Sequence, residues 1–131
     1  MRTSSFRVKP ALADAYTCYL REARAHEIAG RIDAAWACLE AAHIIGQRAT
    51  RLHVGSHVAM LGLAWRTGNL REMRGQAGRS VAAALFTWLW APPGNSGRAS
   101  VWVLATAPVP RDLQAILGSL GDRSTTLESD P

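Results

Sequence analysis

The 131-residue chain has few of the features that usually identify the function of a small protein. It has only two cysteines, Cys18 and Cys38, and no Cys-x-x-Cys pair, which argues against a disulfide framework and is typical of a reducing compartment. The first residues lack the apolar run of a secretory signal. The longest apolar stretch, residues 81–93, is shorter than the about 20 residues that a membrane-spanning helix needs. We therefore expect a cytoplasmic protein that does not enter a membrane.

Acidic residues are scarce in the middle of the chain. Residues 41–111 contain eight arginines and a single acid, Glu72, whereas the last twenty residues contain four acids and one arginine. A basic surface can attract phosphate, nucleic acid or an acidic protein. Basic composition alone is weak support for nucleic-acid binding, so we do not expect a nucleic-acid partner. No P-loop, dinucleotide fingerprint or Gly-x-Ser-x-Gly motif occurs either.

Hydrophobic residues make up 48% of the chain, and their spacing follows the helical period. Gly30 and Gly68 are suited to end helices, and Thr50 is a suitable N-cap. The pattern predicts helices over residues 11–29, 32–45, 51–66, 70–90 and 111–120. In the fourth helix the stripe expected to face the core includes Leu70, Met73 and Ala77.

These elements predict an all-α fold, a compact four-helix hairpin-type bundle with a short C-terminal helix. We expect one helical domain over residues 11–120, after an N-terminal lead-in (1–10) and before a disordered polar tail (121–131). The first hairpin resembles a tetratricopeptide repeat, of which only one copy is visible. Residues 99–106 are expected to form an extended arm across the bundle, and residues 94–97 a turn of unassigned role.

The chain does have a group of metal-ligating residue types. Glu40 and His43 lie three apart late in the second predicted helix. His53 and His57 lie four apart early in the third. Side chains three or four apart project from one helix face, and the short connection brings the two pairs close together. Cys18 is expected at a similar height in the first hairpin and could add a soft ligand.

This group predicts either a metal site or a hydrogen-bonded polar cluster in the core. Imidazole and carboxylate suit one divalent transition ion such as zinc, nickel, cobalt or copper. The spacing of Glu40 and His43 is also that of di-iron bundles, but those need the motif twice, and it occurs here once. The alternative is that the histidines satisfy one another, because an unpaired polar group in a core costs about 1–3 kcal/mol.

Several segments of the chain, including those that contain these histidines, resemble a known protein family. The segments that carry the resemblance, which extends over about residues 10–120, are residues 39–47, 53–61, 94–97 and 110–113. They resemble the bacterial domain-of-unknown-function family DUF3703. The family has no established activity, and some members are encoded near heavy-metal resistance genes. Membership implies a small helical protein and favours a role connected with metals.

Two functions follow from these observations. The first is a metal-binding or metal-response accessory protein that uses Glu40, His43, His53 and His57. The alternative is a small helical interaction module with structural histidines, whose arginine face binds an acidic protein or which forms a homo-oligomer. A metal-dependent enzyme ranks third, because no acid, base or substrate pocket can be named.

Overall fold

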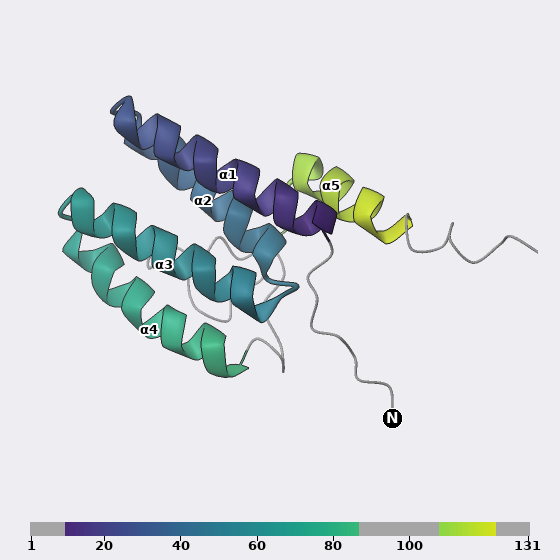
Figure 1. The fold of residues 1–131 in the computed structure, drawn as a ribbon. Helices are drawn as coiled ribbons and strands as arrows, with labels where there is room; N and C mark the ends of the chain where they lie inside the picture. Colours follow the sequence, from purple (N-terminus) through teal and green to yellow (C-terminus); the bar gives the residue numbers. More distant parts are fainter. Residues whose placement is uncertain (1–9, 87–107, 123–131) are drawn as a thin grey trace, which may run out of the picture.

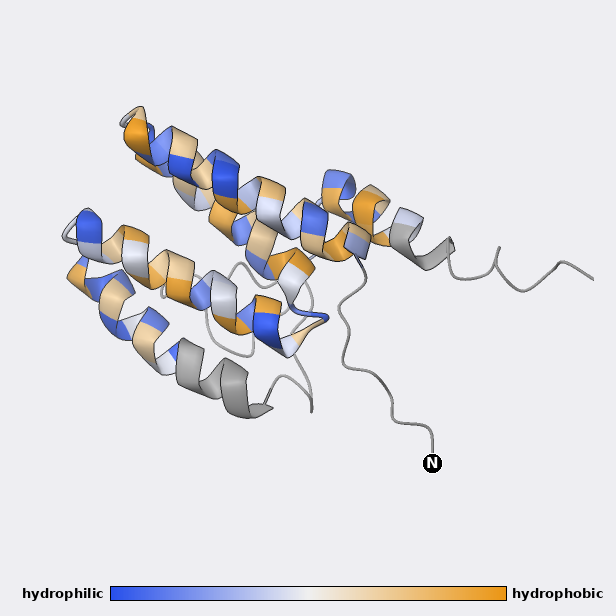
Figure 2. Ribbon diagram, in the orientation of Figure 1, coloured by the Kyte–Doolittle hydropathy of each residue, from blue (hydrophilic) through white to orange (hydrophobic). Residues whose placement is uncertain are grey.

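The computed structural model describes residues 10–86 and 108–122, and within these ranges the protein is entirely helical (Figure 1). The helices are α1 (Pro10–Ile28), α2 (Ile32–Gly46), α3 (Thr50–Arg66), α4 (Leu70–Phe86) and α5 (Arg111–Asp122). The predicted all-α class is therefore confirmed. Hydrophobic and hydrophilic residues alternate along the helices, as amphipathic packing requires (Figure 2).

The first four helices form two antiparallel hairpins that are closed in the same way. Gly30 has φ +73° between α1 and α2, and Gly68 has φ +70° between α3 and α4. The backbone N–H of Arg31 donates to the carbonyl of His26 at 2.9 Å, and that of Asn69 to the carbonyl of Ala64 at 2.8 Å. Glycine accepts this left-handed conformation without a Cβ clash, so both turns satisfy the last carbonyls of the preceding helix.

The two hairpins lie one above the other, and α2 packs against α3 (Figure 1). Near the glycine turns the hairpins share an apolar core made mainly of Trp36, Leu39, Met60 and Leu63. At the surface, Arg66 of α3 binds both carboxylate oxygens of Glu27 on α1.

A second apolar cluster lies at the opposite end of the bundle. There Leu113 of α5 packs against Leu12 of α1 and against Ile44 and Ile45 of α2. The short fifth helix therefore covers the ends of α1 and α2 that lie away from the glycine turns (Figure 1). His43 is directly next to Ile44 in α2, so the polar residues described below adjoin this cluster.

Some local predictions need correction. Ala49 is the N-cap of α3, and Thr50 is already helical, with no side-chain capping bond. Asn69 caps α4 instead, because its Oδ1 accepts the N–H of Glu72 at 3.2 Å. Helix α1 starts at Pro10, and α5 continues to Asp122. The predicted arm (99–106), the turn (94–97) and most of the polar tail lie outside the described residues.

The predicted inner stripe of α4 is wrong at Leu70 and Ala77, whereas Met73 packs against the core as expected. Leu70 is 62% exposed and Ala77 is exposed, whereas Glu72 and Gln76 are buried. The stripe with Leu70 and Ala77 and the stripe with Glu72 and Gln76 lie next to each other on α4. The packing of α4 against α3 buries the polar stripe.

Candidate metal centre

The histidines come together because α2 ends and α3 begins within a few residues. His43 lies in the last turn of α2, and His53 and His57 lie in the first two turns of α3. At this junction Gly46 is so close to α3 that a Cβ would lie 3.1 Å from the backbone carbonyl of Leu52. The missing side chain of Gly46 thus permits the close approach that places the end of α2 against the first turn of α3.

The three imidazole rings form one compact, buried group. His43 Nε2 lies 3.0 Å from His53 Nε2 and 3.2 Å from His57 Nε2. The ring centroids are 4.6–5.1 Å apart, and all three side chains are at most 7% exposed. One nitrogen from each ring lies within 4.8 Å of the other two. The structure therefore confirms that the predicted His53 and His57 pair faces His43.

A chain of hydrogen bonds orients His57 from α4. Gln76 Nε2 donates to the carboxylate of Glu72 at 3.2 Å, so the amide oxygen of Gln76 faces His57. That oxygen lies 2.7 Å from His57 Nδ1. Because an amide oxygen only accepts, Nδ1 carries the hydrogen, and the Nε2 of neutral His57 is left with a free electron pair. This electron pair belongs to the nitrogen that approaches His43.

Neutral imidazoles alone bridge this group poorly. A ring hydrogen on His43 Nε2 can point well at only one of its two close neighbours. If that hydrogen is absent, two bare nitrogens, those of His43 and His57, lie 3.2 Å apart. A metal ion removes the conflict because it accepts an electron pair from every ring.

The protonation state of the rings also favours metal coordination. Burial, with a smaller contribution from His57, lowers the pKa of His53 to about 4. Burial lowers the pKa of His57 as well; the hydrogen bond that His57 donates to Gln76 opposes this shift, and the charge of Arg79 adds to it. Both rings are therefore neutral at pH 7, and neutral imidazole is the form that binds a metal.

The spacing of the nitrogens fits a shared ion. Zinc–nitrogen bonds of about 2.0–2.1 Å at tetrahedral angles separate two ligand nitrogens by roughly 3.3 Å. The Nε2 distances from His43 to His53 and His57, 3.0 and 3.2 Å, are close to this separation. Three histidines with one remaining position are a common donor set for transition metals.

The other candidate ligands lie outside this group. Glu40, one turn before His43, is half-buried and is not among the residues whose donor atoms lie within 4.8 Å of one another. Its role as a ligand stays a prediction. Cys18 is exposed on α1, where its thiol contacts Glu22 at 3.6 Å, and it is not part of the histidine group. His26 accepts a hydrogen bond from Arg31 far from the cluster.

Glu72 and Gln76 are the site residues that the sequence analysis missed. They lie four apart on α4, and both are at most 3% exposed. The signal was present in the sequence, because Glu72 is the only acid among residues 41–111. A lone acid four residues before a glutamine on one helix face could have been paired with the inward histidines.

The fold and this cluster define a small all-α protein with three buried, mutually facing histidines. The chain belongs to the family described as protein of unknown function DUF3703, whose model matches residues 10–117. No curated protein and no solved structure matches the chain. Within the described ranges, no helix combines the length and the apolar character needed to cross a membrane.

Proposed function

We propose that the protein is a transition-metal-binding accessory protein in which His43, His53 and His57 hold one divalent ion. The observation that carries this proposal is the convergence of three Nε2 atoms, two of them 3.0 and 3.2 Å from the third. Zinc, nickel, cobalt and copper are the ions that suit imidazole donors. Glu40 is proposed as the fourth ligand, reached from the preceding turn of α2.

The surroundings of the histidines support this function. Metal-binding histidines usually donate their second ring N–H to an oxygen acceptor that fixes the ring and its tautomer. Gln76 provides such an acceptor for His57, and Glu72 in turn holds the Gln76 amide.

The rival hypothesis is a helical interaction module in which the histidines form a hydrogen-bonded structural cluster. The two functions differ in what they require of the three rings. A metal site loses affinity when one ring is replaced, even if the fold is kept. A structural cluster loses only stability, and added metal does not raise its unfolding temperature.

Calorimetric titration tests the proposal directly. The untagged, chelator-stripped protein is titrated with zinc, nickel, cobalt and copper, alongside His53→Gln and the control His26→Gln. We expect one equivalent of at least one ion to bind with about micromolar affinity or tighter. His53→Gln should weaken binding at least roughly tenfold, and His26→Gln should leave it unchanged.

Glu40→Gln then tests the fourth ligand. Weaker binding would support coordination by Glu40, and unchanged binding would assign the fourth position to another donor. Circular dichroism establishes that each variant is folded before its titration is interpreted. A folded wild-type protein that binds none of the four ions, or that binds them as tightly after His53→Gln, would overturn the metal function.

A further inference from the structure

Helix α3 has a second apolar face that the hairpins do not cover. Its inner face, which includes Met60 and Leu63, is buried in the core. A different face carries Val58, Leu61 and Trp65; Val58 is 55% exposed and Trp65 is 71% exposed. A helix that is apolar over more than one face is usually covered on more than one side. Exposed tryptophans are also enriched at binding surfaces.

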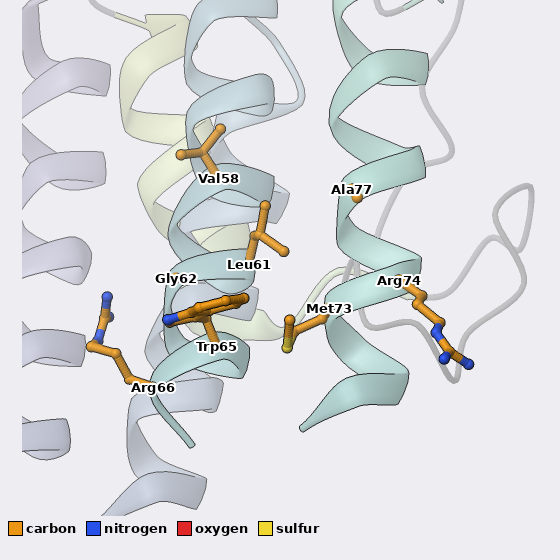
Figure 3. Close-up of a pocket in the computed structure, with 8 residues that line it drawn as sticks. All are labelled: Val58, Leu61, Gly62, Trp65, Arg66, Met73, Arg74 and Ala77. Carbon is orange, nitrogen blue, oxygen red and sulfur yellow. The ribbon is translucent and has the colours of Figure 1, made fainter. Parts of the chain in front are cut away.

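This face forms one wall of a groove, and α4 forms the other (Figure 3). Met73 and Ala77 of α4, which the sequence analysis assigned to the core, both line this groove, although Met73 also packs against the core. Figure 3 shows Met73 beside Trp65 on the facing helix. The open groove has a volume of about 600 Å³. Val58 to Trp65 extends over about 10 Å, or two helical turns.

The charged residues around the groove indicate which charge a binding partner should carry. Arg66 and Arg74 lie among its lining residues. Helices α3 and α4 contain five arginines and one acid, Glu72, whose carboxylate is turned inward to Gln76. The groove is therefore flanked by basic groups, and α3 and α4 contribute no exposed acid. A second copy of this chain would place arginines against arginines if the same face met itself, so charge favours an acidic partner.

We propose that this groove binds an amphipathic helix of a partner protein whose apolar stripe is flanked by aspartate or glutamate. The anchors of that helix fall at positions i, i+3 or i+4, and i+7, and they contact Leu61, Trp65 and Met73. Its carboxylates pair with Arg74 and with Arg66, which already holds one carboxylate, that of Glu27. Helices with this pattern are a common ligand for apolar grooves.

A display selection tests the groove with random peptides, because it does not require the natural partner. Peptides of roughly 16 residues, enough for about four helical turns, are selected on the full-length protein and counter-selected on Ala77→Glu. Ala77→Glu places a negative charge in the groove. Its matched control is Ala25→Glu, which changes an exposed alanine on α1. Selected peptides are then synthesised and titrated by fluorescence anisotropy, and sedimentation velocity reports the oligomeric state.

We expect the selected peptides to combine helical apolar spacing with an excess of acidic residues. They should bind at least roughly tenfold more weakly to Ala77→Glu, and equally well to Ala25→Glu and to the wild type. The proposal is overturned if no such class emerges, or if binding is insensitive to Ala77→Glu. It is also overturned if the wild type forms a dimer that only Ala77→Glu dissociates, because the occupant would then be a second copy.

Discussion

The α1–α2 and α3–α4 hairpins have similar lengths and the same glycine turn, but they bury different kinds of side chain. In the first hairpin the buried residues are almost all apolar, and His43 is the only buried side chain there that can bind a metal or carry charge at neutral pH or below. The second hairpin buries several polar residues, namely His53, Ser56, His57, Glu72 and Gln76. The first hairpin thus supplies much of the apolar burial that stabilises the fold, and the second supplies most of the chemistry.

The outer surfaces of the hairpins differ as well. Helices α1 and α2 contain five acids and two arginines, whereas α3 and α4 contain one acid and five arginines. The only acid of the second hairpin is used inside, next to Gln76. Its outer face combines basic charge with an apolar groove, and such a combination is more typical of a binding surface than of a solvated one.

Leu39→Ala should show the largest effect on folding, because it removes apolar volume that the first hairpin contributes to the shared core. Leu39 is 4% exposed, and truncation of such a residue costs about 2–5 kcal/mol. Leu70→Ala, at a residue that is 62% exposed, should change the free energy of unfolding by less than about 0.5 kcal/mol. Urea unfolding measures both. If Leu39→Ala lowered the free energy of unfolding by less than about 1 kcal/mol, the first hairpin would not supply the stabilising apolar burial that we assign to it.

Gln76→Leu should act on the metal site more than on the fold. The substitution leaves His57 Nδ1–H without its acceptor and Glu72 without its amide donor, so the ring is no longer held. We expect metal affinity to fall about 10–100-fold, as is typical when the group that orients a ligand is lost. Gln114→Leu is the control, because Gln114 is an exposed residue of α5 whose side-chain amide donates to the carbonyl of Val109. If Gln76→Leu and Gln114→Leu bound the metal with equal affinity, Gln76 would have no role in orienting His57 for metal binding.

Two glycine substitutions compare the junction of the hairpins with the surface of the second. Gly46→Ala places a methyl group 3.1 Å from the backbone of Leu52 and should destabilise the protein by about 1–3 kcal/mol. Gly78 lies within α4, and apart from its own stretch of helix no described residue has a heavy atom within 4 Å of the position that a Cβ would occupy there, so Gly78→Ala should stabilise the protein by about 0.5–1 kcal/mol. Thermal unfolding of both variants measures the difference. A stabilising Gly46→Ala would contradict the close approach at Gly46, and a destabilising Gly78→Ala would contradict the open space at Gly78.

Acid should weaken the metal-free protein through its buried histidines. The folded-state pKa of His53 is about 4, below its ordinary value of 6.5, and the pKa of His57 is lowered too. The unfolded chain therefore takes up protons first, so stability falls as the pH drops from 6.5 towards 4. Urea unfolding across this range should give a slope that His53→Gln reduces and His26→Gln leaves unchanged. A slope unaffected by His53→Gln would show that this ring is not held neutral.

The sequence predicted much of the fold because its signals are local. Gly30 and Gly68 mark the turns, and helical spacing places His53 and His57 on one stripe with Met60. The short link after Gly46 then restricts how far His43 can lie from them. Each of these features depends on residues close together in the chain, so the histidine cluster could be anticipated from the sequence alone.

The inward face of α4 could not be predicted in the same way. Leu70, Met73 and Ala77 form a regular apolar stripe, and such stripes usually face the core. The structure buries the neighbouring stripe with Glu72 and Gln76 because His57, from another helix, satisfies the Gln76 amide. The sequence of α4 alone does not contain that partner. For the same reason it could not predict that Met73 and Ala77 line a surface groove.

The central claim is that three histidine nitrogens share one metal ion, and X-ray absorption spectroscopy of the zinc-loaded protein tests it most directly. We predict a first shell of nitrogen and oxygen at about 2.0 Å, with the outer-shell scattering of three imidazoles and no sulfur. His53→Gln should remove one imidazole from that shell, and His26→Gln should remove none. A sulfur shell at about 2.3 Å, or a shell with fewer than three imidazoles, would contradict the account.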